Sequence, residues 1–146
     1  MSRLVVDASV VAKLYFPETL SDRAESVLLA RTRGRVRRPT LLAPDLLYAE
    51  LANVVWKRRR RGDIDMEEAR SVIDEALALP IVAFPSVELS ARALELAMET
   101  DRSVYDCLYL AVAIAERATL VTADERFANA LQDGPFAGRV RWIGQD

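Results

Sequence analysis

Near its start the chain has the stretch Arg3-Leu4-Val5-Val6-Asp7, in which three consecutive apolar residues are followed by a carboxylate. A short apolar run of this kind predicts a buried strand, and similar runs recur at residues 40–43, 81–84, 119–122 and 140–143. Helical patterns separate these runs, and strands that alternate with helices predict an α/β fold with a parallel sheet covered on both faces. In open sheets of this class, sites form outside the carboxyl ends of the strands. Asp7 and Asp124 are expected at two such ends.

The helices are predicted from apolar spacing and from the residues that begin and end them. Asp65 and Glu68 have the spacing of a capping box, and Gly34 and Gly62 are typical of helix ends. Helices are therefore expected at residues 9–15, 20–33, 44 or 45 to 61, 65–79, 86 or 87 to 100, 103–118 and 125–131. The length of 146 residues predicts one domain, residues 1–146, with a core large enough to need no disulfide or structural metal.

Composition excludes several kinds of chemistry. The chain has no histidine, so a Ser-His-Asp triad and an imidazole-bound zinc site are both excluded. Cys107 is the only cysteine, and its apolar helical setting predicts an inert buried thiol. No apolar run approaches the roughly 20 residues of a membrane-spanning helix. The first residues show no signal-peptide pattern, so we expect a cytoplasmic protein without membrane association.

Four acids stand in or beside apolar segments, where an unpaired charge is costly. Each of three has a simple structural explanation: Asp7 could begin a turn or cap a helix, Asp106 could complement a helix dipole, and Asp124 lies in a turn. Glu50 is harder to explain, because apolar residues surround it at helical spacing. Asn53, three residues on, shares its helix face and could orient its carboxylate.

If these acids converge, they predict a divalent-metal site made of oxygen ligands. Without nitrogen or sulfur donors, such a site favours Mg²⁺ or Mn²⁺ over zinc. Clustered carboxylates repel one another, so the site is expected to be incomplete without metal. The expected chemistry is hydrolysis of phosphodiesters by one or two ions.

Two basic runs hold half of the 20 basic residues, although the formal net charge is only −2. They comprise Arg31, Arg33, Arg35, Arg37 and Arg38, and then Lys57, Arg58, Arg59, Arg60 and Arg61. Solvated faces, a nucleic-acid footprint and a surface for an acidic protein partner all fit this pattern.

Four segments resemble the motifs of PIN-domain ribonucleases, and among these the VapC group of toxin–antitoxin pairs. The segments are Leu4-Val5-Val6-Asp7-Ala8-Ser9, Pro44-Asp45-Leu46-Leu47-Tyr48-Ala49-Glu50-Leu51-Ala52-Asn53, Val104-Tyr105-Asp106-Cys107-Leu108-Tyr109-Leu110-Ala111-Val112-Ala113 and Leu120-Val121-Thr122-Ala123-Asp124-Glu125-Arg126-Phe127. They come in the expected order and cover nearly the whole chain. The one departure is Cys107, where a small alanine is commoner in the family.

The resemblance implies a parallel sheet of order 3-2-1-4-5 in a homodimer. It implies that Asp7, Glu50, Asp106 and Asp124 are catalytic, with Asp7, Asp106 and Asp124 as metal ligands. Ser9, Asn53 and Thr122 are the implied supporting polar residues. It further implies cleavage of RNA with Mg²⁺ (or Mn²⁺) and inhibition by a cognate antitoxin protein.

Two other classes of function compete with this one. A receiver or an aspartyl phosphatase is disfavoured, because Asp7 lacks an acidic partner, Ser9 replaces a second aspartate, and Lys13 and Lys57 are the only lysines. A PIN-like protein-binding module that no longer cleaves RNA stays open as the alternative, although the presence of all four acids argues against it.

Overall fold

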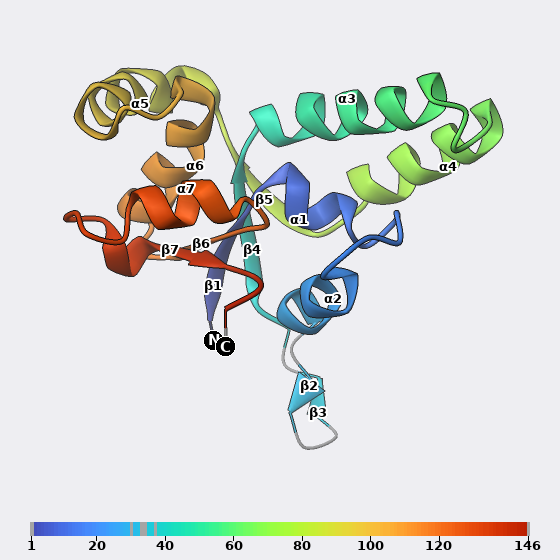
Figure 1. Ribbon diagram of the computed structural model, residues 1–146, viewed down its shortest axis with the longest axis horizontal. Coiled ribbons are helices and arrows are strands. Elements are labelled where there is room, and N and C mark those ends of the chain that lie inside the picture. Colours follow the sequence, from blue (N-terminus) through green and yellow to red (C-terminus); the bar gives the residue numbers. More distant parts are fainter. Residues whose placement is uncertain (1, 30, 33–34, 37, 146) are drawn as a thin grey trace.

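The fold is built on a five-stranded parallel sheet whose order is β5-β4-β1-β6-β7. The computed structural model describes residues 2–29, 31–32, 35–36 and 38–145 (Figure 1). The strands are β1 (Arg3–Val6), β4 (Thr40–Pro44), β5 (Ile81–Phe84), β6 (Thr119–Thr122) and β7 (Val140–Trp142). Counted along the chain, these five strands have the order 3-2-1-4-5, which confirms the predicted α/β sheet.

Strand β1 lies at the centre of the sheet and pairs with a strand on each side. Val5 is in register with Leu42 of β4 and with Leu120 of β6. All three side chains are almost completely buried, as expected of a parallel sheet covered on both faces. The carboxyl ends of β1 and β6 therefore lie side by side, and this brings together the residues that follow each strand.

Helices cover both faces of the sheet (Figure 1). The chain forms α1 (Ala8–Ala12), α2 (Ser21–Leu29), α3 (Leu46–Arg60), α4 (Met66–Leu77), α5 (Ser86–Thr100), α6 (Val104–Ala115), α7 (Glu125–Ala130) and the 3-10 turn η1 (Ala137–Arg139). Helix α6 is the most buried of them, with every residue from 107 to 113 in the core. It contacts β1, β4 and β6, the three central strands of the sheet.

The predicted helix over residues 20–33 is wrong at both ends. Leu20 has a φ of 70°, in the left-handed region, and α2 runs only from Ser21 to Leu29. Two short antiparallel strands follow, β2 (Arg31–Thr32) and β3 (Arg35–Val36). Thr32 and Val36 are β-branched and favour extended backbone, and in α2 only Ala24 and Leu28 are buried. Gly34, the predicted helix end, lies outside the described residues.

The predicted capping box at the start of α4 is confirmed. The Asp65 carboxylate accepts from the Glu68 amide, and the Glu68 carboxylate accepts from the Asp65 amide.

Helices α3 and α4 form a hairpin that extends to one side of the sheet (Figure 1). Within the described ranges, every helix falls short of what a bilayer-spanning segment needs in length or in apolar content.

Candidate active site

Asp7 is the most tightly held acid of the site. It follows β1 and caps α1, where its Oδ1 accepts hydrogen bonds from the Val10 amide (3.1 Å) and the Ser9 hydroxyl. Its Oδ2 accepts a 2.6 Å hydrogen bond from the Thr122 hydroxyl. Burial raises the pKa of Asp7 to about 6, the three donors oppose that rise, and the Glu50 charge adds to it.

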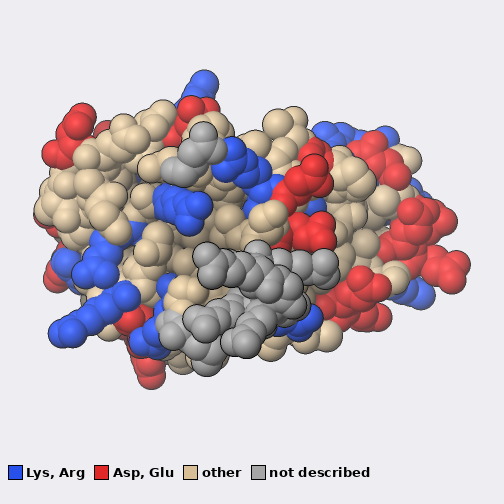
Figure 2. All heavy atoms as spheres, turned by 90° about the horizontal axis from the view of Figure 1, so that it is seen from below, with Lys and Arg blue, Asp and Glu red and all other residues tan. Residues whose placement is uncertain are grey.

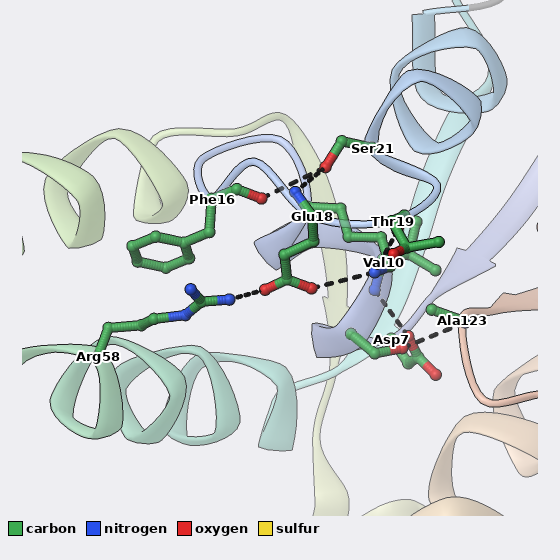
Figure 3. Close-up of polar contacts among 10 residues, drawn as sticks. Asp7, Val10, Phe16, Glu18, Thr19, Ser21, Arg58 and Ala123 are labelled. Carbon is green, nitrogen blue, oxygen red and sulfur yellow. Dashed lines mark hydrogen bonds and ion pairs between the residues drawn. The ribbon is translucent and has the colours of Figure 1, made fainter. Parts of the chain in front are cut away.

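The end of β6 is tied to the same carboxylate. Thr122 is completely buried, and its hydroxyl accepts from the Asp124 amide (3.0 Å) while it donates to Asp7. The Ala123 amide donates to the Ser9 hydroxyl at 3.2 Å. Figure 3 shows Asp7 beside Val10 of α1 and beside Ala123, the residue that follows β6. Ser9 and Thr122 therefore link the carboxyl ends of β1 and β6 through the Asp7 carboxylate.

Glu50 lies on α3 and is half-buried. Its Oε1 accepts a 2.6 Å hydrogen bond from the hydroxyl of Tyr109, a buried residue of α6. Burial raises the pKa of Glu50, the Tyr109 hydrogen bond opposes the rise, and the Asp106 charge reinforces it. The pKa of Tyr109 is raised strongly by burial and by the carboxylates of Glu50 and Asp7, so its phenol keeps its proton and remains a donor.

Asp106 and Asp124 stand at the N-terminal ends of two helices. Asp106 lies in the first turn of α6, where its amide donates to the N-cap Ser103 (3.1 Å), and Asp124 caps α7 through the Phe127 amide (3.1 Å). Burial raises the pKa of Asp106, the nearby Arg102 guanidinium lowers it, and the charge of Asp124 raises it. The four predicted acids thus form a series in which Glu50 acts on Asp7, Asp106 on Glu50, and Asp124 on Asp106.

The donor set suits a hard divalent cation in its chemistry. Its ionisable donors are carboxylates, and for Asp7, Glu50 and Asp106 burial and then the charge of a neighbouring acid raise the pKa, which bound positive charge would counter. Among residues 2–29, 31–32, 35–36 and 38–145, no three acids already stand in a ready-made coordination group. The side chains face Ser9, Thr122, Tyr109 and Arg102 instead, so they would have to move to bring their oxygens onto one ion.

A hollow of about 470 Å³ opens next to Glu50. Ser9, Asn53, Lys57 and the exposed ring of Tyr105 line it together with small apolar residues of α1 and α3. Asn53 shares this hollow with Glu50, but the described hydrogen bond to Glu50 comes from Tyr109. The supporting role of Asn53 stays a prediction.

The second basic run is partly occupied by contacts within the protein. Arg58 pairs with Glu18 and, at 3.6 Å, with Asp63, and its guanidinium stacks 4.9 Å from the centroid of Phe16 (Figure 3). Arg58 therefore has a structural role. Figure 2 shows that acidic side chains gather at the end of the molecule where α4 lies. Of the first run, Arg33 and Arg37 lie outside the described residues, as do the side chains of Arg31 and Arg35, while Arg38 is exposed.

Sequence reasoning missed two residues of the site, Tyr109 and Arg102. Tyr109 stands in the apolar run of α6, where an aromatic residue predicts only core packing, and its partner is 59 residues away. Arg102 lies between α5 and α6, and its guanidinium reaches Asp106 at 3.4 Å and Asp124 at 3.9 Å. The spacing of Arg102 and Asp106, four residues apart, was the one available signal for that pair.

Comparison with known proteins identifies the family. The PIN domain family model matches residues 4–130. Ribonuclease VapC3 of Pyrobaculum aerophilum is 35% identical over 130 residues, which cover 86% of this chain and 92% of that protein.

Solved structures share the fold. PAE2754 from Pyrobaculum aerophilum superposes with a TM-score of 0.66 at 22% identity, over 98% of this chain and 85% of that one. VapBC2 from Rickettsia felis, solved bound to a DNA fragment from its promoter, gives a TM-score of 0.63 at 18% identity, over 96% and 98% of the two chains. With the family model matched over most of its length and the predicted strand order observed, the chain belongs to the PIN domain family, in which it is related to the VapC ribonucleases.

Proposed function

We propose that the protein is a metal-dependent endoribonuclease, the toxin of a VapBC-type toxin–antitoxin pair. The observation that carries this proposal is the series of four acids, Asp7, Glu50, Asp106 and Asp124, whose charges act on one another where β1 and β6 end. Asp7, Glu50 and Asp106 are at least partly buried and Asp124 is exposed beside them, and a chain without need of the charges would not place acids this near one another, because the arrangement destabilises the charged forms. The relationship to ribonuclease VapC3 supports RNA as the substrate.

In this proposal Asp7, Asp106 and Asp124 hold Mg²⁺ or Mn²⁺. When bound, the ion neutralises charge on a phosphodiester and makes an attacking water more acidic. Ser9 and Thr122 fix both oxygens of Asp7, so that carboxylate is oriented before any ligand arrives. Tyr109 fixes one oxygen of Glu50 and leaves the other free to orient a water or to accept its proton.

The substrate backbone is proposed to pass the hollow beside Glu50. Lys57 and the exposed Tyr105 ring line that hollow, and they offer a charge for a phosphate and a face for a base. Arg58 is excluded from this role, since its guanidinium is already paired and stacked.

We also propose an antitoxin partner and a homodimer in the cytoplasm. A VapBC complex with the same fold supports the partner. The outer face of α5 supports the homodimer, because Val87, Leu94 and Met98 share one helical face and are 85%, 52% and 72% exposed. Val82, on the edge strand β5, is also exposed.

The direct test is RNA cleavage by the purified protein in Mg²⁺ or Mn²⁺ and in EDTA. Glu50→Gln keeps the shape of the side chain and can keep the Tyr109 hydrogen bond, so we expect a loss of about 100-fold or more with an unchanged fold. Glu67→Gln, on the exposed face of α4, is the matched control and should keep full activity. Full cleavage after removal of metal would overturn the mechanism. A folded protein that binds its partner but never cuts RNA would favour the binding module instead.

A further inference from the structure

Arg102 occupies an unusual place among the four acids. It belongs to the short connection between α5 and α6, next to Asp101, whose φ of 56° turns the chain sharply. The Arg102 amide donates to the Thr100 hydroxyl at 3.3 Å, and the next residue, Ser103, caps α6. The backbone of Arg102 is thus held in place, and its side chain lies over the ends of α6 and α7.

One nitrogen of Arg102 contacts two acids at once. Nη2 lies 3.4 Å from Oδ2 of Asp106 and 3.9 Å from Oδ2 of Asp124. The guanidinium also lies 5.3 Å from the centroid of the Phe127 ring, which is buried on α7. A single cationic group therefore joins the two helix ends that carry these carboxylates.

The contacts of Arg102 are incomplete. Its Nε is buried and has no hydrogen-bond partner in the part of the chain that the structure describes. Both ion-pair distances exceed those of a short charge-assisted hydrogen bond, which is about 2.7–2.9 Å. An arginine with an unused buried donor and two long ion pairs is held less firmly than a bidentate pair, so the carboxylates it contacts remain available to a stronger cation.

We propose that Arg102 is an internal counter-ion of the metal site, which holds Asp106 and Asp124 in the metal-free protein and must release them before a divalent cation binds. This inference rests on the proposed function, because it takes both acids as metal ligands. Arg102 is therefore a positioning residue, and it sets the concentration of divalent cation at which the site fills. Its single charge opposes the approach of a doubly charged ion, and its Nη2 faces the same oxygens that the ion would use.

The test measures Mn²⁺ binding without RNA. Free Mn²⁺ is followed by electron paramagnetic resonance at pH 8 in wild type and in Arg102→Gln. We expect the variant to bind Mn²⁺ about tenfold more tightly, a coupling of ordinary size between two ligands of one site. Arg92→Gln removes the same charge from an exposed pair with Glu95 on α5 and should leave the affinity unchanged.

A second variant keeps the test decisive if Arg102→Gln does not fold. Arg102→Lys retains the charge but has one nitrogen, so its affinity for Mn²⁺ should lie between those of wild type and Arg102→Gln. In EDTA, Arg102→Gln should also melt below wild type, because two carboxylates lose their shared cation, and saturating Mn²⁺ should remove that difference.

The outcomes separate the two proposals. If wild type binds Mn²⁺ and the Arg102 variants bind it equally or less tightly, the counter-ion role is wrong and the metal site stands. If neither wild type nor any variant binds Mn²⁺, the metal-dependent function and the role of Arg102 both fail.

Discussion

Replacing Asp7 by asparagine should abolish activity and at the same time stabilise the metal-free fold. Asparagine has nearly the same shape, and its oxygen can still accept from Ser9 and from the Val10 amide. The substitution removes a carboxyl group whose pKa is raised by burial from 3.8 to about 6. A raised pKa in an acid means that folding favours the protonated form, so the ionised carboxylate weakens the fold.

The size and pH dependence of the effect follow from that pKa. Below about pH 3.8 Asp7 is protonated in both the unfolded and the folded chain, and its ionisation contributes nothing. Between 3.8 and about 6 the unfolded chain releases the proton first, so the free energy of unfolding falls as the pH rises. At about 1.4 kcal/mol per pH unit, the loss reaches roughly 3 kcal/mol above pH 6.

The net gain in Asp7→Asn should be smaller, about 1–2 kcal/mol at pH 8. The amide nitrogen cannot accept from the Thr122 hydroxyl, and hydrogen bonds to a neutral side chain are weaker than those to a carboxylate. For a chain of this length, such a gain raises the melting temperature by roughly 2–8 °C.

The assay is thermal and urea unfolding in EDTA at pH 4, 6 and 8, with RNA cleavage measured in parallel. Asp74→Asn, an exposed aspartate on α4, is the control and should change stability little at any pH. An Asp7→Asn protein that is less stable than wild type at pH 8, or equally stabilised at pH 4 and pH 8, would refute the argument that burial strains this carboxylate.

Three further substitutions test the surroundings of the site. Tyr109→Phe removes the donor that opposes the raised pKa of Glu50, so the pH–rate profile should move to higher pH, with a loss of roughly tenfold at pH 6 and a smaller loss at pH 8. Arg58→Ala should cost about 1–2 kcal/mol in urea unfolding, because two ion pairs and an aromatic contact are lost, whereas a matched change at the exposed Arg59 should cost less than about 0.5 kcal/mol. Cys107→Ala should keep full cleavage and lose only about 1 kcal/mol of stability, and a large loss of activity would show that this buried thiol takes part in the chemistry.

The strands of the central sheet could be predicted because each can be recognised from its own few residues. Most are short apolar runs, Asp7 directly follows β1, and Asp124 lies two residues after the end of β6. The end of α2 was mispredicted because residues 29–34 have no apolar periodicity to decide between helix and strand. Strand order came from family resemblance, since pairing between β1 and β6 depends on residues far apart in the chain.

The four acids of the candidate site could be picked out from the sequence, but the residues that contact them could not. Asp7, Glu50, Asp106 and Asp124 stand out because carboxylates are rare in apolar surroundings. Tyr109 and Arg102 are ordinary residues for a buried helix and a helix connection, and only the packing of α6 against α3 and α7 gives them partners. Whether the four acids converge on one ion depends on side-chain positions, which no periodicity in the sequence determines.

The direct pairing of β1 with β6 also determines when the site can exist. Asp7 and Thr122, which donates to it, are 115 residues apart in the chain. A ribosome that adds about 5–20 residues per second needs on the order of ten seconds to pass from one to the other. Throughout that interval the growing polypeptide has its first acid but lacks the strand that orients it, and any translation product that stops before Thr119 lacks Asp124 altogether. The order of the strands therefore means that the proposed site can form only after both Thr122 and Asp124 have been synthesised.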